Sequence, residues 1–367
     1  HPLYVDVEGL GPVVEGGGGG PSPPRRLPGP PTAPLPPHLA ARAASARARL
    51  NALPALDYEA VMAEKLAIAR AVFDDTGRVE VETSDDYQAF LHDNAGWLRP
   101  YAAHAVCRAL FGSPDHWTWG ALATPTPADF DRLCSPDADF APTVRFTWWL
   151  QWKAHAQLAA AAAAAARHRV ALKGDLPIGV DRRGVDAWAH PALFRMATST
   201  GAPPDYFDKK GQAWGFPTYD WGAAAGERYA WWAARLCHLA RYFSALRIDH
   251  ILGFFRIWEL PPGATTGILG RFRPGKGITR AELEAEGMWD VDRLADPFIT
   301  PGHAAVALAG GGGPAAVERF TVPGPCEGRL ALAPSVWREE DIERVEAAVG
   351  EEEAGDGGGG VGPAAAA

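Results

Sequence analysis

Apolar residues recur at helical spacing through much of the first half of the chain. In the segment 57–73, Val61, Leu66, Ala69 and Phe73 fall near one stripe of a helix. The segment 146–167 ends in an alanine run, and alanine has the highest helix propensity. The sequence therefore predicts helices at 57–73, 87–91, 101–111 and 146–167.

The pattern changes after residue 169. Residues 170–180 (VALKGDLPIGV) predict a short strand that breaks at Gly174, and 245–250 (ALRIDH) predict a second strand that ends in polar residues. A loop rich in Gly, Pro and aromatic residues spans about 198–221, and a Trp-rich helix is predicted at 229–243.

Helix, strand, long loop, helix and strand in this order are typical of a β/α barrel. We therefore expect an α/β fold, a partial (β/α)8 TIM barrel with a helical insertion and disordered segments. Catalytic side chains of such barrels lie at the carboxyl ends of strands. Asp175 and Asp249 both fall at such positions, so we expect the two carboxylates to face one cavity.

Two stretches of low complexity interrupt the pattern. Gly and Pro at the density found in 15–48 do not support a packed element, so we expect a disordered insertion there, apart from a possible helix near 40–48. Residues 351–367 are expected to be disordered for the same reason. The predicted domains are a barrel segment at 1–14, the insertion at 15–48, part of the main barrel at 49–300 and a divergent Gly/Ala-rich tail at 301–367.

The composition of the chain limits the classes of partner that it is expected to bind. The formal net charge is -9, which argues against nucleic acid or an anionic membrane as the main partner, because both select basic patches. The 14 Trp residues suit stacking on sugar faces as well as a hydrophobic core. The cysteines form no CxxC pair and no metal-ligand spacing, which favours a reducing compartment; they are Cys107, Cys134, Cys237 and Cys326.

The segment Arg247-Ile248-Asp249 carries the first candidate chemistry. Residues two apart in a strand face the same side, so Arg247 and Asp249 are expected to point into the barrel mouth and Ile248 into the outer packing layer. A guanidinium beside a carboxylate favours the ionised form, which a covalent glycosyl intermediate requires. On spacing alone, an ordinary Arg–Asp ion pair at a strand end is the favoured explanation, because such pairs are common.

Two other features are suggestive but less specific. Asp175 follows Gly174, and such an Asp either bonds a sugar hydroxyl or simply caps a turn. The aromatic residues of the loop are spread among Gly and Pro without helical or strand periodicity, which favours either a carbohydrate-stacking loop or a packed Ω-loop. They are Tyr206, Phe207, Trp214, Phe216 and Tyr219.

Three long blocks together resemble a known family. GDLPIGVDRRGVDAW at 174–188, GAPPDYFDKKGQAWGFPTYDW at 201–221 and RIDHILGFFRIWELP at 247–261 resemble the amylomaltases and disproportionating enzymes of glycoside hydrolase family 77, and above all its plant cytosolic members. The resemblance covers 1–10 and 50–298. It implies a retaining 4-α-glucanotransferase of starch and maltose metabolism that needs no cofactor and no metal, and a cytoplasmic location, with a plastid location left open.

The resemblance also assigns roles to residues. Asp249 matches the nucleophile, Arg247 the arginine that holds it, and His250 a neighbour that contacts the donor sugar. Asp175 matches an aspartate at the sugar site. The loop residues Tyr206, Phe207 and Trp214 match the loop over the acceptor groove. The implied partners are an α-1,4-glucan donor and a glucan acceptor, with no nucleic acid and no membrane; oligomeric state is left open.

The sequence also departs from the family pattern. Neither the segment that carries the acid/base Glu nor the Thr-His-Asp-Asn type motif is found, so we expect a fragment that is inactive alone. If the chain does transfer glucan, Glu259 and Glu340 are the first candidates for the acid. Two alternatives stay open, a noncatalytic glucan- or partner-binding fragment and an α-glucan hydrolase.

Overall fold

The computed structural model describes residues 1–12, 33–291, 293, 298–303, 320–324, 328–336 and 341. These residues form two compact units. Unit 1 comprises His1–Phe194 and Tyr219–Asp249, and unit 2 comprises Arg195–Thr218 with the described residues from His250 onward.

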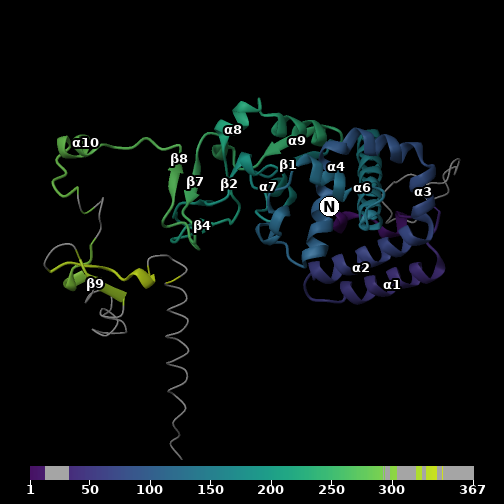
Figure 1. Ribbon diagram of the computed structural model, residues 1–367, viewed down its shortest axis with the longest axis horizontal. Helices are drawn as coiled ribbons and strands as arrows, with labels where there is room; N and C mark the ends of the chain where they lie inside the picture. The colour runs from purple at the N-terminus through teal and green to yellow at the C-terminus, as the bar shows by residue number, and fades with distance from the viewer. Residues whose placement is uncertain are drawn as a thin grey trace, which may run out of the picture. The chain divides into compact units, whose positions relative to one another are not determined.

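Unit 1 is mainly helical (Figure 1). Its helices are α1 (Pro37–Asn51), α2 (Tyr58–Val72), α3 (Arg78–Thr83), α4 (Asp85–Phe111), α5 (Pro127–Leu133), α6 (Ala141–Arg167), α7 (Val185–Ala189), α8 (Trp221–Gly226) and α9 (Ala230–Ala240). Its central strands are β1 (Lys173–Leu176) and β6 (Ala245–Ile248), which pair in parallel. Helix α1 packs against α2, and α4 packs against α6.

Local sequence signals fix the ends of these helices. The side chain of Asp57 accepts from the backbone N–H of Ala60 and caps α2, as sequence periodicity at 57–73 led us to expect. Ser84 caps α4 in the same manner, and Gly112 ends it in the left-handed conformation that glycine adopts without strain. The predicted helices at 87–91 and 101–111 are therefore one continuous helix.

Helix α1 corrects the expected insertion. Residues 37–48 were assigned to a disordered segment with a possible helix near 40–48, but the helix already begins at Pro37. Proline is well suited to the first turn of a helix, and the alanine-rich sequence continues it. Burial of Leu39, Ala43 and Ala46 anchors the helix to the rest of unit 1. The earlier part of the predicted insertion, 15–32, and the predicted disorder at 351–367 lie outside the described residues.

Strand β1 corrects a second expectation. The strand runs through Gly174 instead of breaking there. A Cβ atom at this position would lie 2.6 Å from the ring of Phe243 and 3.0 Å from Leu246, so glycine permits close packing within the strand. The second strand ends at Ile248, directly before Asp249, as expected.

Unit 2 contains a small antiparallel sheet (Figure 1). The strand order is β4 (Gln212–Ala213), β3 (Ser199–Ala202), β7 (Ile257–Leu260) and β8 (Arg271–Arg273). The remaining elements named in this unit are α10 (Arg280–Ala285), β9 (Thr321–Pro323) and β10 (Leu330–Leu332). The short strands β2 (Phe194–Arg195) and β5 (Thr218–Tyr219) lie at the borders between the units in sequence. The region 198–221, expected to be a loop, therefore contains strands β3, β4 and β5.

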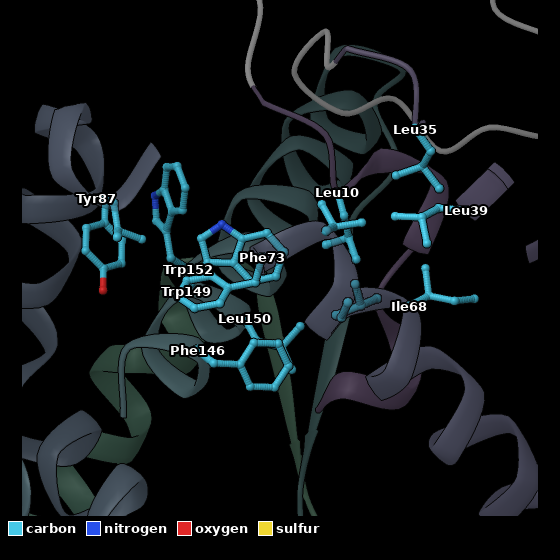
Figure 2. Packing of buried hydrophobic residues seen from close by; sticks show 14 of the residues in the cluster. Leu10, Leu35, Leu39, Ile68, Phe73, Tyr87, Phe146, Trp149, Leu150 and Trp152 are labelled. Atoms are coloured by element: carbon cyan, nitrogen blue, oxygen red, sulfur yellow. The ribbon is translucent and has the colours of Figure 1, made fainter. Parts of the chain in front are cut away.

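A buried ion pair lies inside the aromatic core of unit 1. Figure 2 shows the cluster around Trp149 and Trp152. Lys153 donates to Glu80 at 2.6 Å and to the carbonyl oxygen of Gly11 at 3.2 Å. Trp149 Nε1 donates to the other oxygen of Glu80 at 3.0 Å. The pair thus ties the amino-terminal segment, α3 and α6 to one another.

Among the described residues, no helix is long and apolar enough to cross a membrane.

Removing one charge of this pair is expected to destabilise the protein strongly. Glu80→Gln leaves the Lys153 ammonium buried without its counter-charge, which costs about 3–5 kcal/mol of unfolding free energy. Asp74→Asn is the control, because Asp74 pairs with Arg78 at the surface and such pairs contribute about 0–1 kcal/mol. Urea unfolding measures both changes, and equal shifts for the two variants would contradict the assigned role of the buried pair.

Candidate functional site

The register of β1 and β6 brings the predicted polar residues of unit 1 together. Asp175 lies opposite Arg247, and Leu176 lies opposite Ile248. The backbone N–H of Asp249 donates to the carbonyl oxygen of Leu176 at 3.1 Å, so the parallel hydrogen bonding continues to this residue. Asp175 and Asp249 therefore lie at neighbouring carboxyl ends of two parallel strands.

Arg247 contacts both carboxylates. Its Nε donates to Oδ1 of Asp175 at 3.0 Å, and its Nη2 lies 2.6 Å from Oδ2 of the same carboxylate. This two-nitrogen contact orients the guanidinium plane. The same Nη2 lies 3.9 Å from Oδ1 of Asp249, within electrostatic range but beyond a hydrogen bond. Asp175 and Asp249 therefore lie beside the same guanidinium.

The exposure of these residues bears on their role. The side chains of Asp175, Arg247 and Asp249 are all about half exposed. An ion pair so open to water contributes little to folding stability, because solvent screens it. Its clearer consequence is geometric: Arg247 is held by Asp175, and the oxygens of Asp249 stay accessible to a ligand.

Ile248 corrects one detail of the strand prediction. Alternation predicts that this side chain enters an outer packing layer, but it is 44% exposed. Strand β6 pairs with β1, and no further strand is paired with it among the described residues. The outward face at Ile248 is therefore not covered by the described part of the chain.

Three buried side chains hold the segment that follows β1. The hydroxyl of Tyr219 donates to the carbonyl oxygen of Ile178 at 2.6 Å. Nε2 of His116 lies 3.1 Å from the carbonyl oxygen of Arg182, and Nε2 of His104 lies 3.0 Å from that of Arg183. Each imidazole must carry its proton on Nε2 to donate. Sequence reasoning missed both histidines as positioning residues, because their partners lie 66 or more residues away in the chain.

The predicted aromatic residues belong to unit 2. Tyr206 and Phe207 are 83% and 91% exposed, and their rings pack edge to face at 5.4 Å. The carboxylate of Asp205 accepts from the backbone N–H groups of Phe207 and Asp208, both at 2.8 Å, and so shapes the turn that presents the two rings. Large aromatic side chains displayed on a shaped turn form a surface suited to ligand stacking.

Trp214 and His250 lie against each other in the same unit. Their ring centroids are 5.1 Å apart at nearly a right angle. His250 has a left-handed backbone conformation with φ 47°, directly after Asp249 in the chain. Trp214 Nε1 also donates to Oε1 of Gln212 at 2.8 Å. Two of the predicted substrate-binding residues are thus in direct contact.

Glu259 does not fit the role of acid catalyst. Its side chain is 3% exposed and lies in the β3–β7 sheet, where it accepts hydrogen bonds from Thr198 and Thr218 and pairs with Arg273. An acid must reach the glycosidic oxygen, and this carboxylate is enclosed by its partners. Glu340, the other candidate, lies outside the described residues.

Comparison with known proteins supports the family resemblance. The sequence profile of glycoside hydrolase family 77, described as 4-alpha-glucanotransferase, matches residues 1–292. The chain belongs to glycoside hydrolase family 77.

Relatives within this family differ in how much of their length the chain spans. The "4-alpha-glucanotransferase DPE2" of Oryza sativa subsp. japonica is 50% identical over 244 residues, which are 66% of this chain and 26% of that protein. The 4-alpha-glucanotransferase of Thermus thermophilus is 31% identical over 252 residues, 66% of this chain and 48% of that protein. The chain thus spans between about a quarter and half the length of these relatives.

Solved structures show the fold of the family. An amylomaltase from Streptococcus agalactiae, solved in complex with acarbose, matches with a TM-score of 0.52 and 20% identity over 74% of this chain and 58% of that one. The amylomaltase from Corynebacterium glutamicum also matches with a TM-score of 0.52, at 24% identity over 74% of this chain and 36% of that one. The described α/β arrangement therefore has the fold of amylomaltases.

The histidine contacts predict a pH dependence of stability. The pKa of His104 is lowered from about 6.5 to about 4, chiefly by burial and to a smaller extent by the nearby charges of Arg108 and His116, while the carbonyl of Arg183 and the charge of Asp181 partly oppose the shift. The unfolded chain therefore binds the proton first as the pH falls. The stability that His104 contributes is complete above about pH 6.5 and is lost towards pH 4, by up to about 3 kcal/mol.

His104→Gln is expected to reduce this acid destabilisation, because the amide keeps a donor and does not titrate. Urea midpoints at pH 7 and pH 4.5 measure it, with the exposed His92→Gln as the control. His116, whose pKa burial also lowers, is expected to retain a smaller part of the pH dependence. An identical acid loss in wild type and His104→Gln would show that the site does not titrate as described.

Proposed function

We propose that this chain carries the nucleophile half of a retaining 4-α-glucanotransferase. The observation that carries the proposal is the contact of Arg247 with both Asp175 and Asp249 at neighbouring strand ends. The family match over residues 1–292 and the name shared by the relatives support the reaction class. Starch or maltose metabolism is the proposed setting, and an α-1,4-glucan is both donor and acceptor.

The proposed reaction has two steps. A carboxylate oxygen of Asp249 attacks the anomeric carbon of the donor, and the bond from that carbon to the glycosidic oxygen breaks as this oxygen takes a proton from an acid. A glycosyl ester of inverted configuration forms on Asp249. The 4-hydroxyl of an acceptor glucan then attacks the same carbon, gives up its proton to the conjugate base and releases Asp249 with net retention.

The other residues are assigned by position. Arg247 is fixed by Asp175 and places positive charge beside Asp249 without bonding its oxygens. The proposed stabilisation of the oxocarbenium-like transition state is electrostatic and uses no cofactor. His250 is proposed to contact the donor sugar, and Tyr206, Phe207 and Trp214 are proposed to stack on the acceptor glucan.

We further propose that β1 and β6 are neighbouring strands of a (β/α)8 barrel. Parallel pairing, the intervening helix α9 and the amylomaltase fold support this assignment. The sequence lacks the family's acid/base segment, so residues 1–367 alone are proposed not to transfer from natural maltodextrins.

Hydrolysis and noncatalytic binding are the competing functions. With α-maltosyl fluoride as donor and excess maltose as acceptor, transfer lengthens the acceptor whereas hydrolysis releases free maltose. The fluoride leaves without protonation, so cleavage of this donor does not depend on an acid, for which the proposed function assigns no residue. A noncatalytic glucan-binding protein would bind maltoheptaose yet leave the fluoride donor intact.

Asp249→Asn is expected to leave the affinity for maltoheptaose within about twofold, because the change is isosteric, and to lower the initial rate of fluoride release at least about a thousandfold, as loss of a nucleophile does. Asp131→Asn, which changes a surface carboxylate paired with Arg99, is the control and should match wild type. Fluoride release by Asp249→Asn at a tenth of the wild-type rate would overturn the assignment of the nucleophile.

Trp214→Ala is expected to weaken maltoheptaose binding by roughly 1–3 kcal/mol, the effect of one lost aromatic contact. Isothermal titration calorimetry measures the change. Trp289→Ala is the matched control, because Trp289 is 91% exposed in the same unit but lies outside the aromatic loop. If both variants bind as wild type does, Trp214 is not a glucan contact.

A further inference from the structure

Glu259 lies at the centre of a buried polar network in unit 2. Its Oε1 accepts from the hydroxyls of Thr218 at 2.9 Å and Thr198 at 3.1 Å, and its Oε2 accepts from Nη1 of Arg273 at 3.3 Å. The two threonine hydroxyls lie 2.9 Å from each other. A buried carboxylate is costly unless its oxygens are bonded and its charge is paired, and both conditions are met here.

The network joins the two ends of the aromatic segment. Thr198 precedes β3 and Thr218 begins β5. The aromatic segment is the stretch 199–217 between them, and its two ends lie close together because the two threonine hydroxyls are in contact. The carboxylate of Glu259, which belongs to β7, accepts from both ends at once. Glu259 therefore holds together the two ends of the segment that displays Tyr206, Phe207 and Trp214, and we call this pair of contacts the clasp.

Backbone hydrogen bonds connect this clasp to Trp214. Thr200 lies opposite Glu259 in the β3–β7 pair. The N–H of Trp214 donates to the carbonyl oxygen of Thr200 at 2.9 Å, and the N–H of Thr200 donates to the carbonyl oxygen of Phe216 at 2.8 Å. The backbone of Trp214 is thus hydrogen-bonded to Thr200, the residue of β3 that lies opposite Glu259.

We propose that Glu259 is a positioning residue for glucan binding, which clasps Thr198 and Thr218 and thereby sets the indole of Trp214 against His250. The proposal rests on the proposed function of the aromatic segment. Glu259 takes no part in proton transfer in this proposal. It affects glucan binding only by setting the position of Trp214.

A double-mutant cycle with maltoheptaose as the probe tests this coupling. Glu259→Gln keeps the shape of the side chain and removes the charge that holds Arg273 and the hydroxyls. It is expected to weaken maltoheptaose binding roughly two- to thirtyfold, the range of energetic coupling through packed networks. Glu259→Gln combined with Trp214→Ala is expected to bind no more weakly than Trp214→Ala alone, because the lost contact is the same.

The indole resonance of Trp214 supplies a readout that is independent of glucan. Its Nε1–H signal, assigned by its loss in Trp214→Phe, is expected to shift in Glu259→Gln because the bond to Gln212 is disturbed. Thr218→Val removes one donor with little change of shape and should cause a smaller shift in the same direction; it also serves if Glu259→Gln fails to fold. Glu80→Gln, a buried carboxylate of unit 1, is the control and should lose stability without either effect.

The outcomes separate this inference from the proposed function. Wild type that does not bind maltoheptaose would overturn both. A second outcome would overturn the clasp alone. In it, Trp214→Ala weakens maltoheptaose binding, whereas Glu259→Gln and Thr218→Val change neither the binding nor the indole signal. Additive losses in the double variant would show that Glu259 does not act through Trp214.

Discussion

The parallel pairing of β1 with β6 is the constraint on which the proposed site depends. It places Asp175 opposite Arg247 and continues through the hydrogen bond from Asp249 to Leu176. A shift of one residue in this register would turn the polar side chains to opposite faces, because side chains alternate along a strand. Arg247 would then lose its contact with one carboxylate or both. The placement of Asp249 beside Asp175 and Arg247 therefore follows from the backbone register of the two strands.

Strands β1 and β6 form a short two-stranded sheet, so the position of this sheet depends on the residues packed around it. The close approach of Phe243 to Gly174 packs the strand on its buried side. Contacts of His104, His116 and Tyr219 with backbone carbonyls fix the segment after β1. Helix α4, which supplies His104, also contributes to a core whose aromatic side chains surround a buried ion pair. The position of the exposed carboxylates thus depends on buried groups of unit 1.

Sequence patterns predicted some levels of this organisation and missed others. Periodicity found the helix at 57–73 and both strands, because those signals are local. Gly174 was misread as a strand break, since the neighbour that explains it, Phe243, lies far along the chain. Asp175, Arg247 and Asp249 could be grouped because parallel strands share an edge. The burial of Glu259 could not be foreseen, because it depends on tertiary contacts with Thr198, Thr218 and Arg273 that no spacing rule encodes.

The most direct test of the central claim is to identify the residue that becomes covalently glycosylated. α-Maltosyl fluoride needs no acid to expel its leaving group, so it isolates the step assigned to Asp249. Peptide mapping by mass spectrometry after brief incubation and acid quenching locates any maltosyl ester. The account predicts the ester on Asp249. The labelled peptide begins at Ile248 if the protease cleaves after Arg247, and otherwise includes Arg247. A maltosyl ester on another carboxylate, or none on a chain that binds maltoheptaose, would contradict it.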